Sequence, residues 1–264
     1  MNANPDRAGE SGSDETWVRR EQSGAIVYLT LNRAAKYNVL SAAMMDALKS
    51  ELAQIGSDSS ARVVVLRAEG RAFSAGHDLT EMGAAAGVEE MRALFAACSA
   101  LMLAIRVLPQ PVIARVQGVA TAAGCQLVAM CDLAVASSAA RFAVSGINLG
   151  LFCSTPAVAL SRNLLQKPAL EMLLTGEFIS AEAARDYGLV NRVVAPELLD
   201  EEVAKLAATI AAKSPAAISA GKRLFYQQRE MPIVAAYAQA AEVMAANAVQ
   251  DDARRGIAQF TRRG

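Results

Sequence analysis

Histidine is almost absent from this chain of 264 residues, because His77 is the only one. A zinc site built from several histidines is therefore excluded, and a Ser-His-Asp triad would depend on that single residue. The four cysteines show no Cys-x-x-Cys spacing and no histidine at ligand spacing. We therefore expect reduced thiols, no bound metal and a cytoplasmic location.

Net charge and long apolar runs are also lacking. Twenty-six basic residues balance twenty-six acidic ones, which argues against a nucleic-acid partner. No apolar run reaches the roughly 18 residues of a membrane-spanning helix, so we expect no membrane partner. Residues 1–20 are largely polar, without the apolar stretch of a secretory signal or the acid-poor composition of a mitochondrial presequence, and we expect a disordered tail.

Strand-like and helix-like segments alternate through the next part of the chain. Strand composition occurs in residues 25–32, 62–70, 111–118, around 133–136 and in 140–144, and helical periodicity in residues 41–55, 88–107 and from about 121 to the short strand around 133–136. This alternation predicts an α/β fold with mostly parallel sheets.

The end of the chain has a different pattern. Ser180 is expected to cap a short helix that stops before Gly188, and a strand then runs to Pro196. Everything beyond is helical in periodicity, in segments 197–213, 215–228 and 231–249 with alanine-rich faces. We therefore expect a core over residues 21–196 and a helical region over 197–264 that packs on a partner subunit.

Two segments place small residues where backbone must approach a ligand. RAFSAGHDL, residues 71–79, follows a buried strand, and QGVATAAGCQL, residues 117–127, opens a helix with alanine, threonine and glycine. Helix N-termini present unpaired NH groups and a partial positive charge. Such prepositioned donors stabilise a carbonyl oxygen that gains negative charge.

In this order the two segments resemble the crotonase (enoyl-CoA hydratase/isomerase) family. Its FxAGxDL signature appears as Phe73 to Leu79, Gly118 to Asp132 looks like G-x-A-x-G-G-G-x-E-L-x-x-x-C-D, and residues 29–40 resemble LNRPxxxNAL. The resemblance covers about residues 24–263. It implies an α/β crotonase-like spiral of repeated ββα units with a C-terminal helical trimerisation region. It also implies an acyl-CoA thioester as partner, as in fatty acid metabolism, no cofactor apart from the coenzyme A of the substrate, and a homotrimer or dimer of trimers.

Site residues follow from the same resemblance. It places the oxyanion NH groups on Ala75 and Ala123, the loop from Ala72 to Ala75 at the adenine end of coenzyme A, and Arg33 and Lys36 near its phosphates. The other residues expected to contact substrate are Phe73, Ser74, Gly76, Asp78, Leu79, Gly146, Cys153 and Ser154.

The sequence departs from the family at both glutamates of its hydratases, which are Gln126 and Gly146 here. Hydration of an enoyl thioester needs a base for water and an acid for the α-carbon. Three interpretations stay open: an enzyme with relocated groups, the candidates being His77, Asp78, Cys153 and Ser154; a hydratase or isomerase in which Gln126 orients water; or a pseudoenzyme that binds acyl-CoA without turnover. The first expectation is an enoyl-CoA hydratase/isomerase-like protein that stabilises a thioester enolate.

Overall fold

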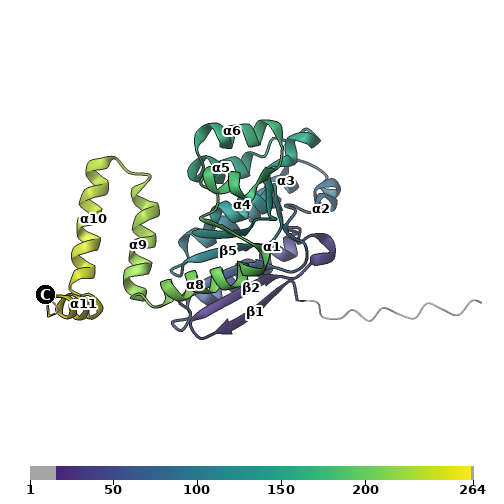
Figure 1. Cartoon of the computed structure of the whole chain (residues 1–264). Coiled ribbons are helices and arrows are strands. Elements are labelled where there is room, and N and C mark those ends of the chain that lie inside the picture. The colour runs from purple at the N-terminus through teal and green to yellow at the C-terminus, as the bar shows by residue number, and fades with distance from the viewer. Residues whose placement is uncertain (1–15, 263–264) are drawn as a thin grey trace, which may run out of the picture.

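Two sheets stacked in a spiral form the centre of the molecule (Figure 1), a computed structural model that describes residues 16–262. The larger sheet has the order β1-β2-β3-β5-β7-β10, in which β1 is antiparallel to β2 and the other pairs are parallel. Its strands are β1 (Val18–Ser23), β2 (Ile26–Leu31), β3 (Val63–Ala68), β5 (Val112–Val116), β7 (Leu133–Ser137) and β10 (Arg192–Val194). The smaller sheet has the order β4-β6-β8-β9, with β4 (Ala72–Ser74), β6 (Val119–Thr121), β8 (Arg141–Ala143) and β9 (Ile179–Ser180).

The repeating unit is a strand of the larger sheet, a short strand of the smaller sheet, and one or two helices. β3 and β4 precede α2 (Leu79–Ala84) and α3 (Val88–Val107), and β5 and β6 precede α4 (Ala123–Met130). β7 and β8 precede η2 (Ser145–Leu149), α5 (Ser154–Asn163) and α6 (Gln166–Thr175). This order confirms the predicted ββα spiral. The strands of the smaller sheet have two or three residues, too few to give a periodic signal of their own.

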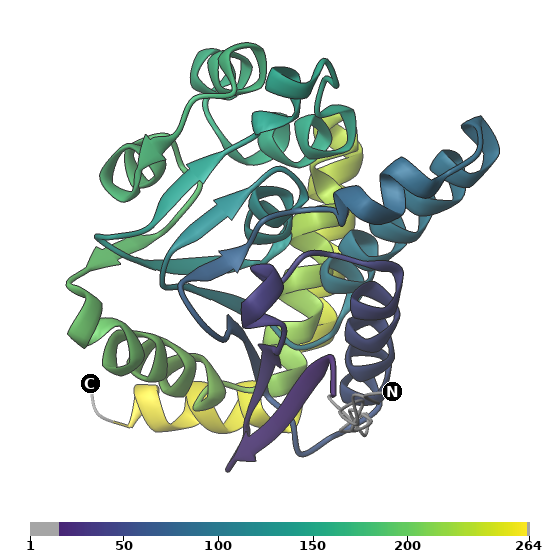
Figure 2. The ribbon, with the colours of Figure 1, turned by 90° about the vertical axis from the view of Figure 1, so that its right-hand side faces the viewer.

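Different elements cover the two faces of the larger sheet. On one face lie the smaller sheet and helices α1 (Ala42–Gly56), α3 and α4, which share one hydrophobic core (Figure 2). On the other face α8 (Leu199–Ala211) buries Leu199, Val203 and Ala207 against β3, β5 and β7. The predicted boundary at residue 196 is therefore wrong for α8, whose apolar face the sheet needs as cover.

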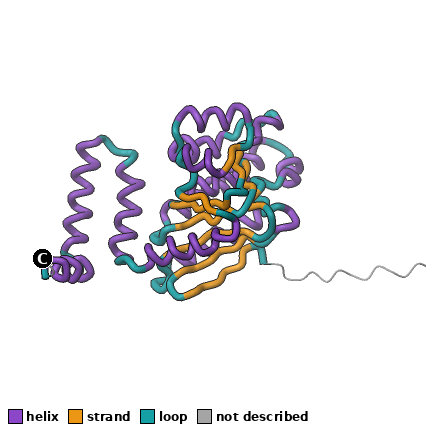
Figure 3. The backbone as a smooth tube through the Cα atoms, viewed as in Figure 1, coloured by secondary structure: helices purple, strands orange, loops and turns teal. Residues whose placement is uncertain are grey.

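The remaining C-terminal helices stand apart from the sheets, as the predominantly helical left side of Figure 3 shows. They are α9 (Pro215–Gln228), α10 (Ile233–Ala248) and α11 (Asp251–Thr261), and α10 packs along α9. α9 is anchored to the core by Lys222, whose ammonium bonds the Asp132 carboxylate at 2.7 Å. α11 falls inside the predicted helical region 197–264 but beyond its last predicted segment, 231–249. The trimer or hexamer stays a prediction.

The N-terminal boundary also needs correction. β1 begins at Val18 and pairs with β2 over six residues, so the predicted tail 1–20 ends inside a strand. The sequence of β1, VRREQS, is too polar to be recognised as a strand, and the strand is held by its backbone pairing with β2. The predicted disorder of residues 1–15 lies outside the described residues. Within residues 16–262 no helix is long and apolar enough to cross a bilayer.

Shorter helices complete the chain: η1 (Ala34–Lys36), α7 (Ala181–Asp186) and η3 (Pro196–Leu198). Ser180 caps α7 by accepting a hydrogen bond from the Ala183 NH, as predicted.

Candidate active site

The loop after β4 is held by two buried polar side chains. The Asn38 side chain accepts a bond from the Arg33 NH and donates to the Glu69 and Ala72 carbonyls. The Ser74 hydroxyl donates to the Asn38 carbonyl at 2.8 Å and accepts from the Gly76 NH. Together these bonds fix the backbone from residue 74 to residue 76 against the loop before α1.

Ala75 is not the free donor that the sequence predicts, because its NH donates to the Tyr37 carbonyl at 3.0 Å. The next amide is different. The Gly76 carbonyl accepts from the Leu40 NH at 2.7 Å, and in a trans peptide the His77 NH then points away from Leu40. Across the described residues the His77 NH has no hydrogen-bond acceptor. The available donor lies two residues beyond the predicted one.

The start of α4 supplies a second amide. Ala122 precedes the helix with φ 50° and ψ −122°, a conformation that favours glycine, and its NH bonds the Ala143 carbonyl. Ala123 is the first helical residue, so its NH has no intrahelical acceptor. Neither does it bond any other atom of the described chain.

Close backbone contact brings the two amides together. Gly76 has φ +91°, and a Cβ there would lie 2.9 Å from the Ala122 Cβ and 3.0 Å from the Ala123 nitrogen. A Cβ on Gly124 would lie 2.3 Å from the Ser74 carbonyl oxygen. The two segments predicted from the sequence are thus in direct contact, with the His77 and Ala123 amides at the junction.

A cavity of about 260 Å³ opens beside this junction. Its polar lining side chains are His77, Ser145, Cys153, Ser154 and Thr155. The apolar ones include Leu79, Met82, Phe95, Leu149, Leu151 and Phe152. No carboxylate is among the described residues that line it. The described lining of this cavity therefore offers no glutamate for acid–base catalysis.

His77 is the titratable side chain whose ordinary pKa lies nearest neutrality. Its ring packs edge-on against Phe95, with 5.5 Å between centroids. Both ring nitrogens are buried without a hydrogen-bond partner. Burial lowers the pKa of His77, and the nearby Leu40 carbonyl and Glu81 charge oppose that shift. The lowered pKa favours the neutral imidazole, the form that accepts a proton.

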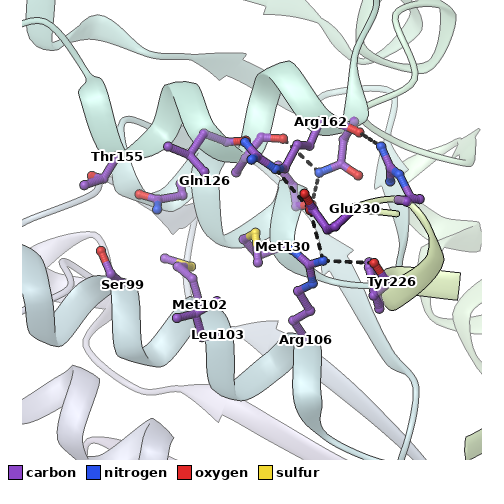
Figure 4. Close-up of a pocket in the computed structure, with 15 residues that line it drawn as sticks. Ser99, Met102, Leu103, Arg106, Gln126, Met130, Thr155, Arg162, Tyr226 and Glu230 are labelled. Atoms are coloured by element: carbon purple, nitrogen blue, oxygen red, sulfur yellow. Dashed lines mark hydrogen bonds and ion pairs between the residues drawn. The ribbon is translucent and has the colours of Figure 1, made fainter. Parts of the chain in front are cut away.

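Gln126 and Gly146 do not face each other across this cavity. Gln126 is buried and lines a second cavity of about 540 Å³ farther along α4 (Figure 4), where its Oε1 lies 4.0 Å from the Cys98 sulfur. Gly146 does line the first cavity, but a Cβ there would lie 2.7 Å from both the Cys153 sulfur and the Leu151 carbonyl oxygen. A glutamate at position 146 has no space without movement of backbone.

Other predicted contacts lie elsewhere. Ala72, Phe73 and Ser74 form β4 with buried side chains, and none of the three lines the cavity. A strand whose side chains fill the core cannot also offer them to an adenine ring. Asp78 caps α2 by accepting a bond from the Thr80 NH, which lowers the pKa of its carboxyl and gives it a structural role.

The basic residues of the loop before α1 are at the surface side of this region. The Arg33 guanidinium lies over the Trp17 ring at 3.9 Å from its centroid. Lys36 ends η1 and is exposed. Their predicted contact with phosphates stays a prediction.

Cys153 and Ser154 lie at the wall of the cavity, and their predicted contact with substrate stays a prediction. Burial raises the pKa of the Cys153 thiol, which keeps it protonated and a poor nucleophile. The Ser154 hydroxyl donates weakly to the Phe152 carbonyl at 3.3 Å. Neither has a base beside it in the described structure.

Sequence reasoning missed Asn38 and Ser145. The Ser145 hydroxyl lies 2.9 Å from that of Thr121 and lines the cavity. Asn38 corresponds to the asparagine of the LNRPxxxNAL motif, so the sequence contained a signal for it. Its bonds to the Glu69 and Ala72 carbonyls appear only in the folded chain. No local signal marks Ser145.

A spiral of ββα units followed by a helical C-terminal region defines a crotonase-type fold. The chain belongs to the enoyl-CoA hydratase/isomerase family, whose sequence model matches residues 21–264.

Three similar proteins span most of this chain. The crystal structure of an enoyl-CoA hydratase from Mycobacterium smegmatis is 54% identical, with a TM-score of 0.92 and coverage of 94% of this chain and 96% of that one. The rat protein named enoyl-CoA hydratase domain-containing protein 3, mitochondrial, is 43% identical over 96% of this chain and 84% of its own length. The 2,3-dehydroadipyl-CoA hydratase of Escherichia coli is 34% identical over 93% of this chain and 95% of its own length.

These relatives correct one expectation. The predicted cytoplasmic location is contradicted by the rat protein and its mouse and human counterparts, which are named mitochondrial. The four cysteines are free and buried in the structure. Free cysteines do not distinguish one cellular compartment from another.

Proposed function

We propose that the protein binds an acyl-CoA thioester with its carbonyl oxygen between the NH groups of His77 and Ala123. The observation that carries the proposal is the contact of Gly76 with the Ala123 nitrogen, which places two unpaired amides together at a cavity wall. Unpaired NH groups are rare in folded proteins and call for a partner. A thioester oxygen that becomes enolate-like supplies that partner, and family membership supports acyl-CoA as the ligand.

The reaction we propose is of the enoyl-CoA hydratase/isomerase type, with the His77 ring moving the proton. In hydration, neutral His77 takes a proton from water as the hydroxyl oxygen bonds to the β-carbon. The two amides hold the resulting enolate, and His77 returns the proton to the α-carbon. Its lowered pKa and two unpartnered nitrogens support this role, for which the ring turns from its buried position toward the cavity.

A second candidate is acyl-CoA binding without turnover. It is favoured by the lining of the cavity, where Gln126 is turned toward the other cavity and Gly146 lacks space for a larger side chain. In this case the amides still bind the thioester oxygen, while no positioned group activates water.

The two candidates are separated by following loss of the conjugated thioester with short, medium and long enoyl-CoAs, and by calorimetric titration of saturated acyl-CoAs. Turnover would exclude the pure binding protein. Binding without turnover would exclude the hydratase. If neither occurs, acyl-CoA recognition itself is wrong.

The amide assignment has its own test. Ala123→Pro removes one NH at the first position of α4, and because its ring also crowds Gly76, retention of the fold is checked by circular dichroism; in the folded variant we expect turnover to fall about 100-fold or more. If the protein only binds, the same variant weakens acyl-CoA binding. Asp251→Pro makes the same change at the start of exposed α11 and serves as control. His77→Gln keeps the backbone NH but removes the imidazole, so it should abolish turnover while binding persists.

A further inference from the structure

The second cavity, of about 540 Å³, adjoins the first one. Thr155 lines both, and Gln126 lies one helical turn beyond Ala123 on α4. Figure 4 shows Gln126 and Thr155 at one end of this cavity and Arg106, Arg162 and Glu230 at the other. An acyl chain whose thioester lies at the Ala123 amide and which passes Thr155 therefore enters a space that leads along α4 to charged side chains.

The walls of the second cavity change from apolar to cationic along this direction. Met102, Leu103 and Met130 lie between the two ends (Figure 4). These side chains suit methylene groups, and the flexible methionines adapt to their shape. The far end is contributed by α3, α5 and the end of α9, which are distant in sequence.

Positive charge is in excess at that far end. Arg106, Arg162 and Arg229 line the cavity together with a single described carboxylate, Glu230. One oxygen of Glu230 lies 3.4 Å from Arg106 and 3.8 Å from Arg162, both long for charged hydrogen bonds. The carboxylate thus neutralises its neighbours incompletely.

Arg106 is held in position for an anion. Its guanidinium donates to the Tyr226 carbonyl at 3.1 Å and lies over the Tyr226 ring at 5.1 Å from the centroid. Only 24% of its side chain is exposed, so its charge is less screened than that of a surface arginine. The same guanidinium nitrogen also faces Glu230 at 3.4 Å, so a substrate carboxylate would take the place of Glu230 beside Arg106.

We infer that the second cavity selects acyl-CoA thioesters whose acyl chain ends in a carboxylate. This inference rests on the proposed function, because the thioester end of the chain must lie at the His77 and Ala123 amides. From Ala123 to Met130 the helix rises about 10 Å at 1.5 Å per residue. A chain too short to cover that distance leaves the arginines without an anion, so the selected acyl group is of medium length.

The test compares matched acyl-CoAs by calorimetric titration of the full-length protein. Adipyl-, suberyl- and sebacyl-CoA are paired with hexanoyl-, octanoyl- and decanoyl-CoA. We expect suberyl-CoA to bind about tenfold or more tightly than octanoyl-CoA, with a smaller preference for the shorter pair. Equal affinity within every pair would overturn the inference while leaving acyl-CoA binding intact. If no acyl-CoA binds, the proposed function fails and this inference with it.

Three variants locate the selectivity. Arg106→Met should lower suberyl-CoA affinity about tenfold and change octanoyl-CoA affinity less than about twofold. Glu230→Gln removes the competing carboxylate at an exposed position, so it should increase the preference for suberyl-CoA. This variant tests the inference independently if Arg106→Met disrupts the contact between α3 and α9. Arg92→Met, in an exposed arginine of the same helix α3 that pairs with Glu89, should leave both affinities unchanged. Equal loss for both ligands in Arg106→Met, or no change in Glu230→Gln, would contradict the inference.

Discussion

The two segments that carry the unpaired amides are held by different physical means. On the His77 side, buried Asn38 and Ser74 side chains bond the loop backbone. On the Ala123 side, the helix start is set by close packing, with Gly124 against the Ser74 carbonyl and Ala122 at φ 50°. One segment is vulnerable to loss of a polar group, and the other to added or badly placed atoms.

The difference explains why the two segments look different in sequence. A loop fixed by side-chain hydrogen bonds needs particular polar residues at distant positions, which local motifs represent poorly. A junction fixed by contact needs small residues in a row, which is what GVATAAG displays. Four substitutions distinguish these mechanisms, in order of decreasing expected effect.

Asn38→Ala should break the polar side most severely. It leaves the Arg33 NH and the Glu69 and Ala72 carbonyls without their partner and places alanine at φ 52°. We expect the free energy of unfolding to fall by about 3 to 5 kcal/mol in urea titrations. Asn247→Ala, which loses one weak bond on α10, is the control. A loss below about 1 kcal/mol for Asn38→Ala would mean that the loop is held by other contacts.

Gly124→Ala should break the packed side. Its Cβ would lie 2.3 Å from a backbone oxygen, so the helix start must move away from β4. We expect a loss of about 2 kcal/mol of unfolding free energy together with weaker acyl-CoA binding. Gly221→Ala on α9 has open space around it and should be neutral or slightly stabilising. Wild-type stability in the Gly124 variant would show that this contact is loose.

Ala122→Gly should stabilise the packed side. Glycine adopts φ 50° and ψ −122° without the steric cost that alanine carries there. After the entropy of the more flexible unfolded chain, the expected gain in unfolding free energy is about 1 kcal/mol. Ala129→Gly, inside the same helix, should have the opposite sign and acts as the control. If both substitutions destabilise equally, the strain at Ala122 is not significant.

The smallest expected effect concerns His77, because only the segment that contains it has a side chain that titrates near neutral pH. Burial places its folded pKa below that of the unfolded imidazole, so the unfolded chain binds more protons between the two values. Stability should therefore fall as pH decreases from about 7.5 to 5.5, and should fall less in His77→Gln. The chain has no second histidine to confuse the profile. The melting temperature of both proteins is measured across this pH range. If it changes with pH equally in the wild type and in His77→Gln, a buried neutral imidazole is contradicted.

Much of the fold was predictable from the sequence. The strand near β2, the helix α1 and the helix α3 follow from β-branched runs and helical periodicity. β4 and β6 were not predicted, because each is a three-residue strand that follows closely on a longer strand, β3 or β5, and was not distinguished from the loop after it. α8 was assigned to the wrong region, since amphipathic periodicity shows that a face is apolar without showing which surface covers it.

The site divides in the same way. The motifs identified the two segments and Ala123, but placed the first donor on Ala75 when its NH is already bonded to Tyr37. Gln126 was expected to act at the thioester, but its side chain lines the second cavity and not the first one beside the two amides. Arg106, Arg162 and Glu230 were not among the candidates, because charged residues on α3, on α5 and in the turn after α9 form no sequence motif.

The sequence by itself determined which segments could approach a carbonyl, since small residues after a strand leave backbone amides accessible. It also determined that neither position 126 nor position 146 carries a carboxylate. Only the tertiary structure decided which amides remain unpaired, that Gly146 is enclosed by Cys153 and Leu151, and that the arginines meet at one end of a cavity. The physical reason is that hydrogen-bond pairing and steric space depend on atoms distant in the chain, and local sequence does not specify where those atoms lie.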